Sequence, residues 1–213
     1  MEHKSLRQQA YEAIREWLST SRLPRGFVTS ELQLCRMLDM SRTPVRSALQ
    51  QLETEGFVTI APKHGVLILD SSAQRVGDLL DVVASLALFA FERQKSADAG
   101  ALTPFADAHC TKLQSLVGNT DDPRDIDAGA VCEWEFELLR HLIRLNRNAE
   151  MDHLFRITSE RLYWPLNARR WSSPFYPETK AVLESLLRDL RAAKETFPQR
   201  LFAYVQLLKK TWT

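Results

Sequence analysis

The chain is 213 residues long, which is enough for one large domain or two smaller ones. Hydrophobic residues make up 45% and charged residues 26% of it, proportions that exclude a disordered or fibrous chain. The net charge is only +1, so any surface for a charged partner must come from the placement of particular residues.

The first part of the chain has the pattern of three helices. Residues 5–19 show the apolar spacing of an amphipathic helix, which ends at the Pro- and Gly-containing turn 23–26. Thr29 or Ser30 can cap a short second helix, and Ser41 can cap a third. Each cap precedes an apolar stripe, so we expect all three helices to pack on one core.

A β-hairpin is predicted after the third helix. The runs Phe57–Ile60 and Val66–Leu69 are rich in β-branched residues and enclose the turn sequence Pro62–Gly65. Three helices followed by a two-stranded hairpin is the order of a winged helix-turn-helix, and we assign it to residues 1–70.

Beyond a hinge at Asp70–Ser72, the remaining chain has only helical patterns. The predicted helices cover residues 72–97, 104–117, 125–146, 148–170, 176–194 and 198–212. Short connections between helices of this length favour an antiparallel bundle. The sequence therefore predicts a mainly α protein, in which residues 71–213 form a bundle of about six helices.

Two arginines begin the third helix. Arg42 and Arg46 are four residues apart and project from one helical face. A guanidinium at this end of a recognition helix can fork onto a guanine edge or hold a phosphate. Ser41, Thr43 and the free amides of the first turn suit a phosphate at the positive end of the helix dipole. The alternative is an ordinary solvated helix with surface arginines.

The hairpin tip favours the DNA-binding interpretation. Lys63 supplies a positive charge, His64 a polar donor, and Gly65 permits a close approach of the backbone. Such a tip suits the minor groove beside a helix in the major groove.

Four motifs in this region carry a family resemblance: Leu23–Gly26, Ser41–Arg46, Leu52–Gly56 and His64–Gly65. Over residues 5–69 they resemble the GntR family of bacterial regulators. The resemblance implies that Arg42 and Arg46 contact operator bases and phosphates and that His64 and Gly65 form the wing tip. The chain departs from the family pattern before the recognition turn, where Arg36 could add a phosphate contact.

The helical remainder is similar in length and helix count to the FadR-like, or FCD, branch of that family. That resemblance implies a domain that dimerises, binds a small acid, and holds a divalent metal through one acidic residue and three histidines. Aligned on Asn148, the four ligand positions are Glu135, Leu139, Thr179 and Tyr204. Only Glu135 keeps a suitable residue type, so we expect no metal cofactor of the usual kind.

A different metal site stays open at this point. Glu133, Glu137 and His141 share one helical face, and His109 or His153 from a neighbouring helix could join them around zinc or manganese. Such side chains more often form a solvated face.

Glu135, His141 and Arg161 are the candidate effector-binding residues, for an organic or sugar acid. Trp164 and the run Arg169–Trp171 add aromatic and cationic groups that could hold a carboxylate. The favoured alternative is that the tryptophans pack in the core while the arginines extend to solvent.

Targeting signals and cysteine patterns are the last features. We see no signal peptide or membrane span in the sequence. The cysteines at 35, 110 and 132 have no zinc-binding spacing, and this favours free thiols in a reducing compartment. The chain also has no phosphate-binding loop, nucleophile elbow or metalloprotease motif, so we do not expect an enzyme.

Together these features predict a cytoplasmic transcription regulator, a repressor. It would bind double-stranded operator DNA as a homodimer and respond to a small-molecule effector. The alternative is a constitutive DNA-binding protein whose C-terminal domain only dimerises.

Overall fold

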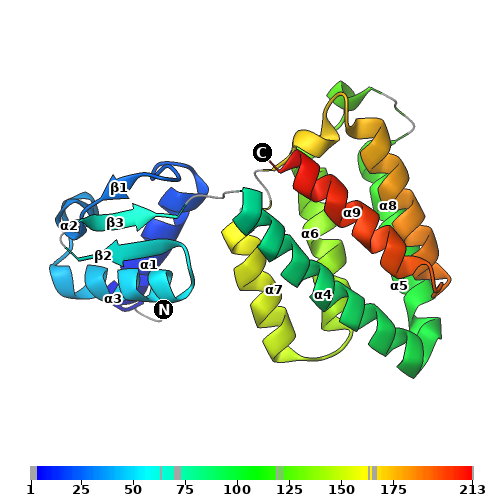
Figure 1. The fold of residues 1–213 in the computed structure, drawn as a ribbon, viewed down its shortest axis with the longest axis horizontal. Helices are drawn as coiled ribbons and strands as arrows, with labels where there is room; N and C mark the ends of the chain where they lie inside the picture. The colour runs from blue at the N-terminus through cyan, green and yellow to red at the C-terminus, as the bar shows by residue number, and fades with distance from the viewer. Residues whose placement is uncertain are drawn as a thin grey trace. The chain divides into compact units, whose positions relative to one another are not determined.

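The computed structural model describes residues 4–62, 64–69, 73–118, 120, 122–162, 164 and 167–212. The chain divides into two compact units, Met1–Ser72 and Ala73–Thr213. The first combines helices with a small sheet and the second is helical (Figure 1). The hinge expected at Asp70–Ser72 lies outside the described residues.

The three predicted helices of the N-terminal unit are present: α1 (Leu6–Ser19), α2 (Glu31–Leu38) and α3 (Arg42–Thr54). The Ser5 hydroxyl caps α1 by accepting a 3.2 Å hydrogen bond from the Gln8 amide. Ser30 caps α2 in the same way, with the Gln33 amide 3.1 Å away. Each cap satisfies one of the amides that a helix N-terminus leaves unpaired.

The predicted hairpin consists of β2 (Val58–Ala61) and β3 (Gly65–Ile68), which pair antiparallel. A third strand, β1 (Val28–Thr29), was not predicted because two residues are too few to show alternation. It pairs with the other edge of β3, so that the strand order is β1-β3-β2. β3 is therefore the central strand of the sheet, and β2 is an edge strand.

One apolar core joins α1 and α3. Its main residues are Ala10, Ile14 and Leu18 from α1 and Val45, Ala48, Leu49 and Leu52 from α3, all buried. Polar bonds tie the same helices at the surface: Arg7 donates to Gln51 (2.9 Å), and the Tyr11 hydroxyl donates to Glu55 (2.6 Å). These contacts hold α3 firmly by one face.

The long helices of the C-terminal unit are α4 (Ala73–Asp98), α5 (Leu102–Val117), α6 (Ala128–Arg144), α7 (Ala149–Leu162), α8 (Tyr176–Arg191) and α9 (Phe197–Thr211). They match the predicted helices except for the fourth, which was expected over 148–170. That helix ends at Leu162, and a separate short 3₁₀ turn, η4, covers Arg169–Trp171. Pro165 in this stretch of sequence explains the break, since proline cannot continue a helix and restricts the residue before it.

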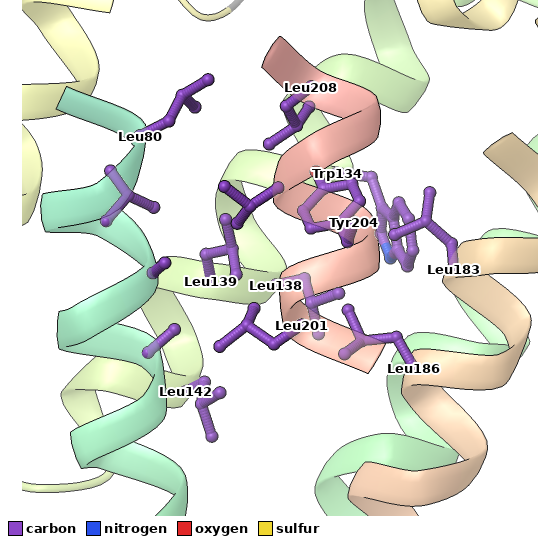
Figure 2. Packing of buried hydrophobic residues seen from close by; sticks show 14 of the residues in the cluster. Leu80, Trp134, Leu138, Leu139, Leu142, Leu183, Leu186, Leu201, Tyr204 and Leu208 are labelled. Carbon is purple, nitrogen blue, oxygen red and sulfur yellow. The ribbon is translucent and has the colours of Figure 1, made fainter. Parts of the chain in front are cut away.

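Leucine is the most frequent residue in the bundle core. Figure 2 shows α9 between α4 and α8, with Tyr204 of α9 surrounded by leucines from several helices. Leu138 of α6 and Leu183 of α8 are both buried there. None of the helices in the described part of the chain is long and apolar enough to cross a bilayer.

Candidate DNA-binding surface and bundle core

Helix α3 presents one face to solvent because its other face is buried. Val45 and Leu49 are at most 1% exposed and lie in the core of the N-terminal unit. Arg42 and Arg46 lie on the exposed side. The two arginines therefore share a solvent-facing surface at the start of the helix.

The N-terminus of α3 offers free hydrogen-bond donors. Ser41 occupies the N-cap position with an extended backbone, but its side chain makes no capping bond. Ser41 and Thr43 are both exposed, as is Arg42. No hydrogen bond or ion pair engages the Arg42 side chain within the described part of the chain. Free amides, a hydroxyl and an unpaired guanidinium at a helix N-terminus form an arrangement suited to an anion.

Arg46 differs from Arg42, because its guanidinium holds a carboxylate of the same chain. Its Nε donates to Glu31 Oε2 at 3.0 Å and its Nη2 donates to Glu31 Oε1 at 3.1 Å. The Arg46 side chain stays 61% exposed. The pair joins α3 to the first turn of α2. Sequence reasoning missed Glu31, since nothing in the spacing of the two residues signals the contact.

The other predicted DNA-binding residues fall at two places. Arg36 is exposed on the last turn of α2. His64 is exposed between β2 and β3, and its Nδ1 lies 2.9 Å from the carbonyl oxygen of Pro62. Lys63 lies outside the described residues. The structure thus gives the helix-turn-helix and the hairpin each at least one exposed polar group.

Gly65 has an internal reason to be glycine. Its φ is +98°, and a Cβ at this position would lie 2.4 Å from the backbone oxygen of Thr29. A side chain would therefore collide with β1. The glycine permits a close approach, but to the chain's own first strand.

The C-terminal unit encloses a buried ion pair. Glu135 of α6 and Arg170 of η4 are both 0% exposed. Arg170 Nε lies 3.0 and 2.9 Å from the two Glu135 carboxylate oxygens, and its Nη2 donates to Oε2 at 2.5 Å. Arg170 Nη1 also donates to the carbonyl oxygen of Asn167. A buried ion pair offsets its desolvation cost only with close geometry and additional hydrogen bonds, and this pair has both.

Further side chains complete the shell of Glu135. The Trp171 indole donates to Oε2 at 3.0 Å, and the Tyr204 hydroxyl donates to Oε1 at 2.9 Å. Burial, followed by the neighbouring Glu135 carboxylate, raises the pKa of Tyr204 well above its ordinary value. Tyr204 therefore stays a hydrogen-bond donor throughout the physiological range.

Aromatic rings flank Arg170. Its guanidinium carbon lies 5.6 Å from the ring centre of Trp164 and 5.4 Å from that of Trp212. Burial by itself would lower the pKa of Arg170, but the Glu135 carboxylate outweighs burial and the pKa lies above its ordinary value. The expectation that the tryptophans belong to the core is met for Trp164 and Trp171. The expectation that the arginines extend to solvent is wrong for Arg170, because Glu135 supplies a buried partner for its charge.

The metal implied by the FCD resemblance does not fit these residues. Of the four aligned positions, Leu139 is apolar and Thr179 donates its hydroxyl hydrogen to the Arg170 carbonyl oxygen at 2.7 Å. The Tyr204 hydroxyl already donates a hydrogen bond to the Glu135 carboxylate. The single carboxylate already holds the Arg170 guanidinium, so a divalent cation would meet one charge-neutralised ligand and a fixed positive charge.

The three predicted effector-binding residues lie in different surroundings. Glu135 is enclosed in the core, whereas His141 is exposed near the end of α6. Arg161 is partly buried on α7, and its Nε has no hydrogen-bond partner among the residues that the structure describes. Burial, followed by the nearby Arg75, lowers the pKa of Arg161. The structure does not bring the three residues together.

His141 instead lies beside His109 of α5. Their ring centres are 5.5 Å apart. His109 is 9% exposed, and its Nδ1 has no hydrogen-bond partner in the described part of the chain. Burial, and secondly His141, lowers the pKa of His109 to about 4. A cavity of about 430 Å³ is lined by both histidines together with Phe105, Ala108, Arg144 and Leu145. It combines an apolar wall with imidazole and guanidinium groups.

The alternative metal site has no support from the geometry. Among the residues that the structure describes, no group of three or more His, Cys, Asp or Glu side chains could hold a metal ion. Glu133 and Glu137 are exposed.

Comparisons with known proteins agree with this geometry. Residues 6–68 match the model of the family described as bacterial regulatory proteins, gntR family. An HTH-type transcriptional regulator from the TAR-I ttuE-ttuC' intergenic region of Agrobacterium vitis is 37% identical over 90 residues, 42% of this chain and 53% of that protein. The Nta operon transcriptional regulator of Aminobacter aminovorans is 30% identical over 133 residues, 62% of this chain and 60% of that protein.

The fold of the whole chain also has a solved counterpart. A putative transcriptional regulator GntR from Rhodococcus sp. RHA1 has a TM-score of 0.63 with this chain, at 18% identity, over 98% of each chain. The two curated relatives are aligned over less than two thirds of their length. Both carry the names of regulators rather than enzymes.

Proposed function

We propose that this chain is a transcription regulator that binds double-stranded operator DNA through α3 and the wing, and the match of residues 6–68 to the gntR family of bacterial regulatory proteins supports the proposal. The observation that carries the proposal is the free N-terminus of α3, where Ser41, Arg42 and Thr43 are exposed together. In the major groove Arg42 would read a base edge, while the first-turn amides and hydroxyls would hold a phosphate.

Arg36 and the wing residues His64 and Lys63 would add contacts to the phosphate backbone. Arg46, whose guanidinium holds the Glu31 carboxylate in the free chain, would exchange that carboxylate for operator DNA. One winged helix makes too few contacts to select a single genomic site, so we propose that two copies bind a palindromic operator and act as a repressor.

The test begins with selection of operator sites from random DNA, followed by fluorescence anisotropy at several salt concentrations. We expect Arg42→Ala to weaken operator binding by about 1–3 kcal/mol and to relax base preference at one position. The control is Arg188→Ala, which removes an exposed arginine from α8. If wild type and Arg42→Ala bind the operator with equal affinity, α3 is not the recognition helix.

We also propose that the C-terminal unit senses a small organic or sugar acid without a metal. The cavity of His109, His141 and Arg144 supports this part, because it pairs an apolar wall with groups that attract a carboxylate. Glu135 and Arg161 would then have no direct contact with the effector.

Thermal denaturation of the full chain against a panel of organic and sugar acids tests the sensor. A stabilising acid should also change operator affinity, and His141→Gln should abolish both effects. Metal analysis of the unchelated protein should find no stoichiometric metal. A panel in which no acid changes either quantity would favour a constitutive DNA-binding protein, for which the enclosed Glu135 is the supporting observation.

A further inference from the structure

Helix α3 carries a third polar side chain on the side that holds its two arginines. Gln50 lies four residues after Arg46 and eight after Arg42, and all three residues are exposed. Residues at such steps of four lie on one side of a helix. The exposed side of α3 therefore continues for about two turns beyond the first turn, on which the DNA-binding assignment depends.

The Gln50 side-chain amide has no hydrogen bond within the part of the chain that the structure describes. Outside the helical ladder, only its backbone is engaged, since the Gln50 carbonyl oxygen accepts from the Thr54 hydroxyl at 2.9 Å. The next residue differs, because the Gln51 amide accepts from Arg7 at 2.9 Å and donates to Glu55 at 3.0 Å. Of two consecutive glutamines, one is used inside the N-terminal unit and the other faces solvent.

The polar side of α3 becomes acidic soon after Gln50. Glu53 is exposed, and its carboxylate accepts a 2.6 Å hydrogen bond from the Ile60 amide. A carboxylate fixed at this place would repel a DNA phosphate. The Thr54 hydroxyl is already bonded to the Gln50 carbonyl oxygen. Along α3, Gln50 is therefore the last free uncharged side chain before the negative charge.

A free primary amide matches one base edge in the major groove. Its nitrogen can donate to N7 of adenine while its oxygen accepts from the N6 amino group, a combination that guanine, cytosine and thymine do not present there. Gln50 carries no charge, so a phosphate attracts it less than it attracts the neighbouring arginines. The chemistry of this side chain favours a base edge over the DNA backbone.

The rise of the helix sets the position of this contact. Four residues advance an α-helix by about 6 Å, and stacked base pairs are about 3.4 Å apart. With α3 lying along the major groove, Gln50 would reach a base pair roughly two steps beyond that of Arg46 and roughly three to four steps beyond that of Arg42.

We infer that Gln50 is a specificity-determining residue that reads an adenine of the operator through its side-chain amide. The inference rests on the proposed function, because it needs α3 in the major groove. It assigns a base to a residue outside the Ser41–Arg46 motif.

Selection of binding sites from random DNA by wild type, Gln50→Ala and Gln50→Glu tests the inference. Gln50→Ala should lose the preference for adenine at one position, on the order of tenfold, and keep the preferences that depend on Arg42. Gln50→Glu should prefer cytosine at that position, because a carboxylate accepts from the cytosine N4 amino group. A change of stability alone cannot exchange one preferred base for another.

Gln51→Ala is the matched control, since it makes the same change at the next residue. It should lower the midpoint of thermal denaturation, because two hydrogen bonds are lost, and leave the selected sequence unchanged. Gln50→Ala should denature at the same temperature as wild type, because its amide is not bonded in the described residues.

Two results would overturn the inference. One is an unchanged base preference in both Gln50 variants. The other is an equal loss of affinity for every sequence, which is the pattern of a phosphate contact.

Arg42→Ala in the same selection separates this failure from failure of the proposed function. If Arg42→Ala changes the base preference and the Gln50 variants do not, α3 remains the recognition helix and only the assignment of Gln50 is wrong. A wild-type chain that selects no sequence would overturn both proposals.

Discussion

Two arginines show how differently the two units use the same side chain. Arg42, at the start of α3, is exposed and has no partner in the described residues, whereas Arg170 is 0% exposed and bonded to Glu135. An exposed guanidinium with no internal partner remains available to an external anion. A buried one with a complete set of acceptors cannot leave without exposing its carboxylate partner to an apolar interior. Burial and partner therefore separate a recognition residue from a structural one.

The largest expected effect comes from breaking the buried pair. Arg170→Met should lower the free energy of unfolding by about 3–5 kcal/mol, because Glu135 would remain buried without a countercharge. Urea denaturation measures the loss. Arg188→Met, in which an exposed arginine of α8 is replaced, should change stability little and serves as the control.

The same comparison becomes sharper with both charges removed. Glu135→Leu combined with Arg170→Met should recover most of the stability lost in the single variant, since two apolar side chains leave no isolated charge. A double variant less stable than Arg170→Met would mean that the cluster acts through its hydrogen bonds to Trp171 and Tyr204 rather than through charge.

His109 gives the next largest effect, as a dependence on pH. The pKa of His109 is lowered to about 4 in the folded chain by burial and by His141, below its ordinary value of 6.5. Below pH 6.5 the unfolded chain binds a proton that the folded chain does not. His109 should therefore lower the free energy of unfolding by about 1.4 kcal/mol for each unit that the pH falls from 6.5 towards 4.

The difference between wild type and His109→Phe isolates this contribution. The variant should lose stability less steeply over that pH range, as measured by urea denaturation at each pH. His153→Gln, at an exposed histidine of α7, should keep the wild-type slope. Parallel curves for wild type and His109→Phe would show that His109 titrates normally.

The smallest effect concerns Arg46, which is exposed like Arg42 but paired with a carboxylate like Arg170. Arg46 is exposed but already holds Glu31, and exposed pairs of this kind contribute about 0–1 kcal/mol. Glu31→Gln should therefore cost little stability while raising operator affinity, because it frees Arg46 and removes a negative charge near the phosphates. Anisotropy titrations compare it with Glu16→Gln, a change on α1. Weaker operator binding by Glu31→Gln would show that the pair positions α3 for DNA.

The sequence predicted the N-terminal unit well because its signals are local. Ser30, the Ser41–Arg46 motif and the apolar stripe around Leu49 act within one or two helical turns, and the helices formed where expected. The unpredicted strand β1 has only two residues, and its pairing with β3 depends on the close approach of Gly65 to Thr29.

The bundle was harder to predict because its chemistry joins distant segments. Glu135 and Arg170 are 35 residues apart, and their contact requires the chain to leave α7 and form the turn η4. The helical periodicity of the sequence predicts one helix over residues 148–170, with its arginines on a solvent-exposed surface. In the structure α7 ends at Leu162. Composition and spacing contain no signal for a buried countercharge, so the sequence alone leaves Glu135 a candidate effector ligand, whereas the structure encloses it with Arg170.

The cluster around Arg170 also makes the bundle visible to spectroscopy. Of the five tryptophans, Trp164, Trp171 and Trp212 contact Arg170 or Glu135, while Trp17 belongs to the N-terminal unit. Indole emission moves to longer wavelength when water reaches the ring. Any opening of the bundle would thus shift the intrinsic fluorescence of the unlabelled protein, whereas events confined to the N-terminal unit would reach Trp17 alone.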